Sequence, residues 1–343
     1  MNLFLIMKTL SRKSPRRKTT PTLDQALDRY LNEVSTNKRG GGGNEVSLAR
    51  TWRCTPLAQR PIGAIFSTDL NRIRDEWIKH LAPATVVRRL ALISHLYTVA
   101  RKDWSMPMLA NPVQLVRRPV VQNGRTRRLY THIKLRGVST LECPRNELEW
   151  LIRATRSPEL PIVMLLASET GMRRSEIAGI RRENLDLVHG TIFLSMTKNG
   201  DSRSVPLTPL AKHVLRQFVA NKPHRGPIFK IKPEAITRAF IRARVKARRQ
   251  YEALCHRYGR KPRDEYFNDL RFHDLRHEST SVLASVFEMH ELAKVTGHKD
   301  TRMLLRYYHP HGKELAQKLA RSPLGKRQIE KLRQERTQEA AYA

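Results

Sequence analysis

Residues 297–308 read GHKDTRMLLRYY, and no other stretch says more about the fold and chemistry of this chain. They end a helical run with Gly297, then place His298, and bring Tyr307 and Tyr308 nine and ten positions after that histidine. A tyrosine hydroxyl, with a pKa of about 10, is a weak nucleophile until cations surround its target. The chain offers such cations upstream, at Arg173, Lys198, His273 and Arg276. This combination favours chemistry on a phosphodiester.

The composition points to a nucleic-acid partner. The chain has 343 residues, with 65 Lys and Arg against 31 Asp and Glu, and a formal net charge of +34. Such a charge favours a polyanionic partner, most simply nucleic acid, and predicts binding that weakens steeply with salt. A ribosomal or histone-like protein could share this charge. Those proteins are usually shorter and poorer in core residues than a chain that is 40% hydrophobic. The length predicts two domains, each with its own core.

The cysteines and the apolar segments exclude several classes of protein. Cys54, Cys143 and Cys255 lie far apart without CxxC spacing, which favours reduced thiols in a cytoplasmic protein over a disulfide framework or a zinc site. The apolar residues between Met1 and Met7 are too few for a signal peptide, and either methionine could be the start. No segment approaches eighteen apolar residues, so we expect no membrane span.

Helical periodicity and turn signals divide the chain. Thr22 and Gln25 form the capping-box pattern that opens a first helix, and apolar residues then recur at helical spacing. Asn111-Pro112 ends a group of four helices, the later three being expected over 45–54, 68–80 and 84–101. The predicted organisation is a basic arm (1–20), an all-helical domain (21–116), a basic linker (117–135), a second, mixed domain (136–325) and a charged tail (326–343).

The second domain is predicted to be mostly helical with one β-hairpin. The hairpin strands are residues 191–194 and 203–207, which flank the turn residues KNGD at 198–201. Asn-Gly is the strongest short hairpin signal. Helices are expected over 144–155, 159–169, 208–220, 233–257, 274–287 and 313–339. The fold class is therefore mainly α with a small β-hairpin.

Taken singly, each motif has an ordinary structural explanation. An arginine in the turn TGMRRSE, residues 170–176, is usually a solvated surface residue, and Lys198 beside Asn-Gly is common hairpin chemistry. His273 and His277 are spaced i, i+4 and could bind a metal, but no carboxylate or cysteine ligand stands suitably near them in sequence. The two tyrosines could be core and rim residues of an amphipathic helix.

Together the motifs resemble the tyrosine recombinase (phage integrase) family. The match covers both domains in architecture and residues 170–310 in motif detail. The shared order is Arg…Lys…His-x-x-Arg…His…Tyr, carried here by Arg173, Lys198, His273, Arg276, His298 and Tyr307. Residues 23–31, LDQALDRYL, and 111–113, NPV, further resemble the shufflon-type DNA invertases within that family.

The resemblance implies how the phosphate is held and attacked. Arg173 and Arg276 would clamp the scissile phosphate and stabilise the charge of its transition state. Glu176 would orient Arg173. Tyr307 would attack phosphorus, giving a 3′-phosphotyrosyl intermediate. Tyr308 is the competing nucleophile, but the family spacing favours Tyr307, and consecutive helix residues diverge by about 100°.

The resemblance also implies how protons move. Lys198 would protonate the leaving 5′ oxygen. His273 would be the general base towards the tyrosine or a donor to the phosphate, and His298 a further donor. Because the covalent link conserves bond energy, we expect neither a cofactor nor a metal. Extra residues between Arg128 and Pro144, and a longer basic loop before Asn268, depart from the common family pattern.

Strand exchange between two partner sites implies a homotetramer on DNA, and leaves open whether accessory DNA-bending proteins take part. Two rival functions remain at this stage. A type IB topoisomerase uses the same chemistry without strand exchange, and a decayed recombinase would bind DNA without cutting it. The filled catalytic positions argue against decay, and the helical first domain favours recombination over relaxation.

Overall fold

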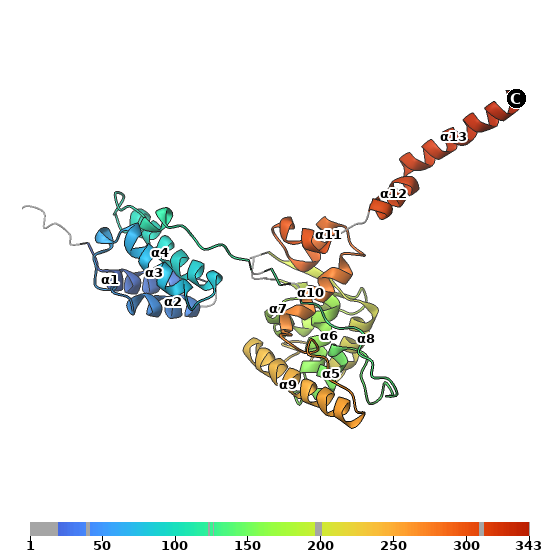
Figure 1. Cartoon of the computed structure of the whole chain (residues 1–343), viewed down its shortest axis with the longest axis horizontal. Helices are drawn as coiled ribbons and strands as arrows, with labels where there is room; N and C mark the ends of the chain where they lie inside the picture. The colour runs from blue at the N-terminus through green and yellow to red at the C-terminus, as the bar shows by residue number, and fades with distance from the viewer. Residues whose placement is uncertain are drawn as a thin grey trace, which may run out of the picture. The chain divides into compact units, whose positions relative to one another are not determined.

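The computed structural model describes residues 20–38, 42–122, 124–125, 127–195, 201–308 and 312–342. The chain divides into an N-terminal unit, Met1–Arg125, and a C-terminal unit, Thr126–Ala343, each with its own hydrophobic core. Helices dominate both units, and the described strands form one small antiparallel sheet (Figure 1). The predicted fold class is confirmed.

Apolar helix faces build the N-terminal unit. Its helices are α1 (Leu23–Tyr30), continued by a π turn (Leu31–Ser35), then α2 (Gly43–Arg53), α3 (Ser67–Ile78) and α4 (Pro83–Asp103), with 3₁₀ turns at Ile62–Ala64 and Pro112–Leu115. The capping box predicted for the first helix is present, since Thr22 and Gln25 bond each other's backbone N–H. Trp52 meets Trp77 edge-on, with ring centroids 4.7 Å apart. The buried Tyr97 hydroxyl donates a hydrogen bond to the carbonyl of Ile62 at 2.7 Å, so this polar group has a partner although it is shielded from water.

A three-stranded antiparallel sheet lies at one side of the C-terminal unit. Its strands are β1 (Leu185–Asp186), β2 (Thr191–Leu194) and β3 (Arg203–Pro206), in that order. Ile192 lies opposite both Leu185 and Val205, and all three residues are buried. The predicted hairpin strands are thus present, and the two-residue strand β1, too short for any periodicity, joins them. Lys198 and most of the predicted turn lie outside the described residues.

Helices make up the rest of this unit. They are α5 (Glu147–Ala154), α6 (Leu160–Thr170), α7 (Arg174–Ala178), α8 (Pro209–Val219), α9 (Pro233–Arg257), α10 (Phe272–Leu283), α11 (Met289–Thr296), α12 (Gly312–Arg321) and α13 (Pro323–Tyr342), with 3₁₀ turns at Arg182–Asn184, Thr301–Met303 and Leu305–Tyr307. Helix α10 packs against α6, and α5 packs against α9 (Figure 1). Of the residues that the sequence singled out, His273 and Arg276 lie on α10, and Arg173 follows the end of α6.

The second half of the expected linker, residues 127–135, packs onto the C-terminal unit, and we call it the strap. Arg127 Nη2 pairs with Glu147 Oε1 at 2.5 Å, and Glu147 is fully buried. The same carboxylate accepts from the backbone N–H of Phe267 at 2.6 Å. Ile133 is buried in the core. One buried carboxylate therefore fastens part of the segment that the sequence predicted to be a basic linker.

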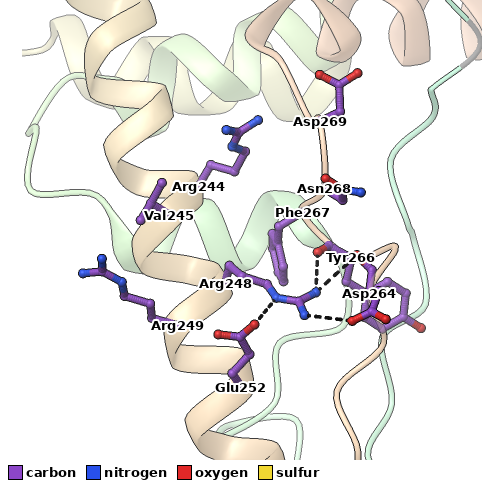
Figure 2. Close-up of a pocket in the computed structure, with 10 residues that line it drawn as sticks. All are labelled: Arg244, Val245, Arg248, Arg249, Glu252, Asp264, Tyr266, Phe267, Asn268 and Asp269. Carbon is purple, nitrogen blue, oxygen red and sulfur yellow. Dashed lines mark hydrogen bonds and ion pairs between the residues drawn. The ribbon is translucent and has the colours of Figure 1, made fainter.

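The long basic loop before Asn268 is fastened in a similar way. Arg248 on α9 donates from Nη1 to the carbonyls of Arg263 (2.6 Å) and Tyr266 (3.0 Å), while its Nε pairs with Glu252 at 2.5 Å (Figure 2). Arg248, Glu252 and Tyr266 are among the residues that line a cavity of about 500 Å³ between α9 and the loop (Figure 2). The loop is thus held against α9 just before α10 begins.

The tail, expected to be helical over 313–339, forms two helices instead of one. Pro323 begins α13 and Ser322 separates it from α12. A proline has no N–H to give to the preceding turn and clashes with the carbonyl four residues back, so the first helix ends there. Lys318 on α12 pairs with Glu288 at 2.8 Å. Within the described part of the chain, no helix is long and apolar enough to cross a membrane.

Candidate active site

Two glycine turns bring Arg173 and Arg276 together. Gly171 ends α6 with φ +63°, and Gly297 ends α11 with φ +69°, a conformation that favours glycine. Arg173 Nη2 donates to the carbonyl of Gly297 at 2.9 Å. Arg276 donates from Nη1 to the carbonyl of Gly171 and from Nη2 to that of Thr296 at 2.8 Å. Each arginine is thus oriented by the turn that follows another helix.

Arg276 is a buried cation held by neutral partners. Its side chain is 5% exposed, and burial, reinforced by the charge of Arg173, lowers its pKa to about 10. It therefore remains protonated at neutral pH. Because backbone carbonyls cannot neutralise it, the site keeps a net positive charge that an anionic ligand could offset. A guanidinium fixed beforehand needs little reorganisation when such a ligand arrives.

Glu176 orients Arg173 as the sequence predicted, and it also binds Arg203, which sequence reasoning missed. Arg173 Nη1 lies 2.9 Å from Glu176 Oε1, while Arg203 contacts the same carboxylate through Nη1 (3.0 Å) and Nη2 (2.8 Å). Burial favours the neutral acid, but the hydrogen bonds and charges of Arg203 and Arg173 hold the pKa of Glu176 below its usual value. The sequence did hold a signal for this residue. Arg203 is two positions before Val205 in a strand, so both side chains lie on the face that is buried at Val205.

The tautomer of His298 follows from its neighbour. Thr296 Oγ1 donates to the carbonyl of Leu292 at 2.6 Å, so it accepts from His298 Nδ1, 2.6 Å away. The other ring nitrogen, Nε2, lies 3.5 Å from Arg276 Nη2. Burial and the charges of Arg276 and Arg173 lower the pKa of His298 to about 4. Without a ligand this nitrogen is an acceptor, and it could donate to a phosphate only after the anion had raised the pKa of the ring.

Gly297 is needed both for its backbone conformation and for space. A Cβ there would lie 2.6 Å from Arg203 Nη1, which Glu176 holds in place. We expect Gly297→Ala to lower the free energy of unfolding by about 2–3 kcal/mol, measured by urea denaturation. Gly137→Ala is the matched control, because φ is +85° there and nothing lies within 4 Å of an added Cβ. It should lose only about 1–2 kcal/mol. Equal losses would show that the contact with Arg203 is unimportant.

The two tyrosines have different surroundings. Tyr307 lies on a 3₁₀ turn rather than the expected helix, and its hydroxyl is 2.5 Å from His277 Nδ1. Burial raises the pKa of Tyr307, while the cations Arg306, Arg128 and Arg276 act in the opposite sense. The Tyr308 hydroxyl instead donates to the carbonyl of Phe287 at 2.6 Å. Burial and two nearby glutamates raise the pKa of Tyr308. Cations that favour the phenolate thus surround only the first of these two tyrosines.

Of the remaining predicted residues, His273 is described and Lys198 is not. His273 is the exposed second residue of α10, and its ring meets that of His277 edge-on, with ring centroids 4.9 Å apart. In the described ranges, these histidines do not join a third His, Cys, Asp or Glu in a metal-binding group. His277 is the second residue that sequence reasoning missed, because its spacing suggested only a metal pair. Nothing in the sequence indicated its contact with Tyr307.

The arrangement is suited to a phosphodiester. Arg173 and Arg276 are oriented cations, His298 lies beside Arg276, and the charge of Arg276 also acts on the Tyr307 hydroxyl. An anion bound here would gain charge-assisted hydrogen bonds, and a phenolic oxygen would stand ready as nucleophile. The structure thus brings together four of the six predicted residues, with His273 beside them and Lys198 outside the described part.

Comparison with known proteins gives consistent matches. The family model described as "Phage integrase family" matches residues 144–314. A shufflon-specific DNA recombinase of Escherichia coli is 33% identical over 310 residues, covering 87% of this chain and 71% of that protein. A putative integrase/recombinase of Haemophilus influenzae is 31% identical over 296 residues, covering 84% of this chain and 72% of that protein.

Solved structures share the fold. An integrase of the Tn1549 transposon, in complex with transposon right end DNA, matches with a TM-score of 0.60 and 16% identity over 88% of this chain and 99% of that one. The lambda integrase tetramer bound to a Holliday junction matches with a TM-score of 0.58 and 18% identity, over 86% and 79% of the two chains. At these identities the likeness concerns the fold alone.

Proposed function

This chain belongs to the phage integrase family, as its sequence predicted, and we propose that it is a site-specific recombinase that cleaves and rejoins duplex DNA through a 3′-phosphotyrosyl intermediate. One observation carries the proposal. The hydroxyl of Tyr307 stands in the field of Arg276, Arg128 and Arg306, and Arg276 lies beside the oriented Arg173. The similarity to a shufflon-specific recombinase supports the same activity.

The geometry supports an in-line displacement at phosphorus. Arg173 and Arg276 bind the non-bridging oxygens and stabilise the charge that builds on them. The Tyr307 oxygen forms a bond to phosphorus as the bond to the 5′ oxygen breaks, and Lys198 gives that oxygen its proton. Attack of a 5′ hydroxyl on the phosphotyrosine reverses these steps. His298 becomes a donor once the phosphate is bound. One phosphodiester is exchanged for another, so the bond energy is conserved.

The partner is double-stranded DNA, and the working assembly is a homotetramer. A formal net charge of +34 suits a long phosphate backbone. Recombination joins two duplexes, each cut on both strands, which requires four nucleophiles. The lambda integrase of similar fold is a tetramer on a Holliday junction. Such a substrate places the enzyme in the cytoplasm, on the bacterial nucleoid, where DNA-bending proteins could assist it.

A trapping experiment tests the proposed function. The test uses a substrate with a nick near the cleavage site, so that the short fragment bearing the new 5′ hydroxyl diffuses away after cleavage. Religation is then blocked, and a covalent protein–DNA adduct should accumulate and appear as a band shift in denaturing gels. The adduct should form in EDTA. Inverted repeats flanking the gene are the first sequences to try as targets. A chain that makes no adduct on a verified target would not be a recombinase. Relaxation of a plasmid without sites, with no exchange between sites, would favour a type IB topoisomerase.

A further inference from the structure

The hydroxyl of Tyr307 contacts a histidine that the sequence did not assign to the site. His277 Nδ1 lies 2.5 Å from Tyr307 Oη, and the two rings are 6.1 Å apart at 33°. His273, which the sequence offered as the base, is one turn earlier on α10 and exposed. The contact is a short, direct hydrogen bond between a nitrogen and the atom that would react.

The surroundings of His277 make it a proton acceptor. Burial, followed by the charges of His273, Arg306 and Arg128, lowers its pKa to about 4, while the charge of Asp274 acts in the opposite sense. The ring is therefore neutral at neutral pH. Tyr307 keeps its proton at that pH, since its own pKa is raised. A neutral imidazole 2.5 Å from a protonated phenol can accept its hydrogen bond.

Full proton transfer in the resting state would be unfavourable, because the phenol is a much weaker acid than the imidazolium. Transfer becomes favourable as the Oη–P bond forms, because the phenolic oxygen then loses its affinity for the proton. The phosphate anion also raises the affinity of the imidazole for that proton. The base and its proton are thus in contact before the reaction starts, which is the geometric requirement for general-base catalysis.

We propose that His277 is the catalytic base that takes the Tyr307 proton during strand cleavage, an inference that rests on the proposed function. In this step the Oη–H bond breaks, the Oη–P bond forms, the P–O5′ bond breaks, and the proton moves to His277 Nδ1. During rejoining the imidazolium returns the proton to the departing phenolate. The sequence left two roles open for His273, general base or hydrogen-bond donor to the phosphate. With His277 as the base, His273 is the donor.

Arg128 is the positioning residue of this pair. Its Nη1 donates to the carbonyl of His277 at 2.8 Å, and its guanidinium carbon lies 5.6 Å from the centre of the Tyr307 ring. Arg128 belongs to the strap, which the neighbouring Arg127 fastens to the buried Glu147. The strap that leads into the C-terminal unit therefore holds both the base and the nucleophile.

Matched histidine variants test the base. Single-turnover cleavage by His277→Ala should fall by about 10²–10⁴-fold at neutral pH. It should partly recover as the pH rises towards about 10, because a growing fraction of the phenol then ionises without a base. His277→Gln can still bond Tyr307 but cannot take its proton, so it should be similarly slow. The defect should persist on a substrate with a 5′-bridging sulfur, because a better leaving group does not replace a base. His273→Ala should lose activity without recovering at high pH.

Several outcomes would overturn the assignment of His277. Full activity in His277→Gln, or a defect in His277→Ala that is the same at every pH, would mean that His277 is not the base. Failure of the wild-type chain to form any adduct would instead refute the proposed function. For the positioning role, Arg128→Ala should slow cleavage about tenfold more than Arg136→Ala, at equal DNA affinity. Arg136 is an exposed arginine just after the strap and serves as the charge control. Equal cleavage rates in the two variants would show that Arg128 does not position His277 and Tyr307.

Discussion

Replacement of Tyr307 by phenylalanine is expected to abolish the covalent adduct on a trapping substrate while leaving DNA binding intact. Phenylalanine keeps the ring that packs beside Leu304 and removes only the oxygen that would bond to phosphorus. Because the nucleophilic oxygen is then missing, the cleavage rate should fall below detection, by at least about 10⁴-fold. Single-turnover cleavage and a gel-shift titration measure the two quantities.

The neighbouring Tyr308 provides the control. Its hydroxyl is engaged with the carbonyl of Phe287, so Tyr308→Phe should form the adduct at nearly the wild-type rate. The variant should lose about 1 kcal/mol of folding free energy with that hydrogen bond. If the adduct disappeared in Tyr308→Phe and persisted in Tyr307→Phe, the nucleophile would have been assigned to the wrong tyrosine.

Arg276→Ala is expected to have the next largest effect, lowering the rate of cleavage by about 10²–10³-fold or more. The variant removes a transition-state donor from the phosphate. It also leaves the carbonyls of Gly171 and Thr296 without their buried partner, so we expect a loss of stability as well. Thermal unfolding followed by circular dichroism separates the two effects.

A lysine at the same position is the informative comparison. Arg276→Lys keeps a positive charge but cannot match the planar fork that reaches both carbonyls. It should fold better than Arg276→Ala and still cleave at least about tenfold more slowly than the wild type. Near-normal cleavage in Arg276→Lys would show that charge alone suffices. Normal cleavage in Arg276→Ala would remove this residue from the site.

Much of the fold was predictable because its signals are local. The capping box at Thr22 and the alternation of strands β2 and β3 depend on residues a few positions apart. The strap and the two-residue strand β1 were not predictable in this way. The strap is held by Glu147, which lies beyond it in sequence, and nothing about a charged segment indicates that its partner is a buried carboxylate.

The residues of the site likewise fall into those that the sequence indicated and those that only the tertiary structure revealed. The family resemblance, which rests on residue type and spacing along the chain, singled out Arg173, Arg276, His298 and Tyr307. Only the tertiary structure showed Arg203 behind Glu176 and His277 against Tyr307. Those contacts join segments that are distant in sequence and depend on how helices pack and how turns close.

The sequence by itself thus determined the family and the helical fold, and it proposed the candidate reactive side chains, since these follow from local patterns and chemical identity. The tertiary structure decided which tyrosine faces the cations and which histidine meets its hydroxyl. Both choices depend on contacts of a few ångströms: the Tyr307 hydroxyl reaches His277 on α10, and the Tyr308 hydroxyl reaches the carbonyl of Phe287. Hydrogen bonding and charge act over such distances in space, whatever the separation along the chain.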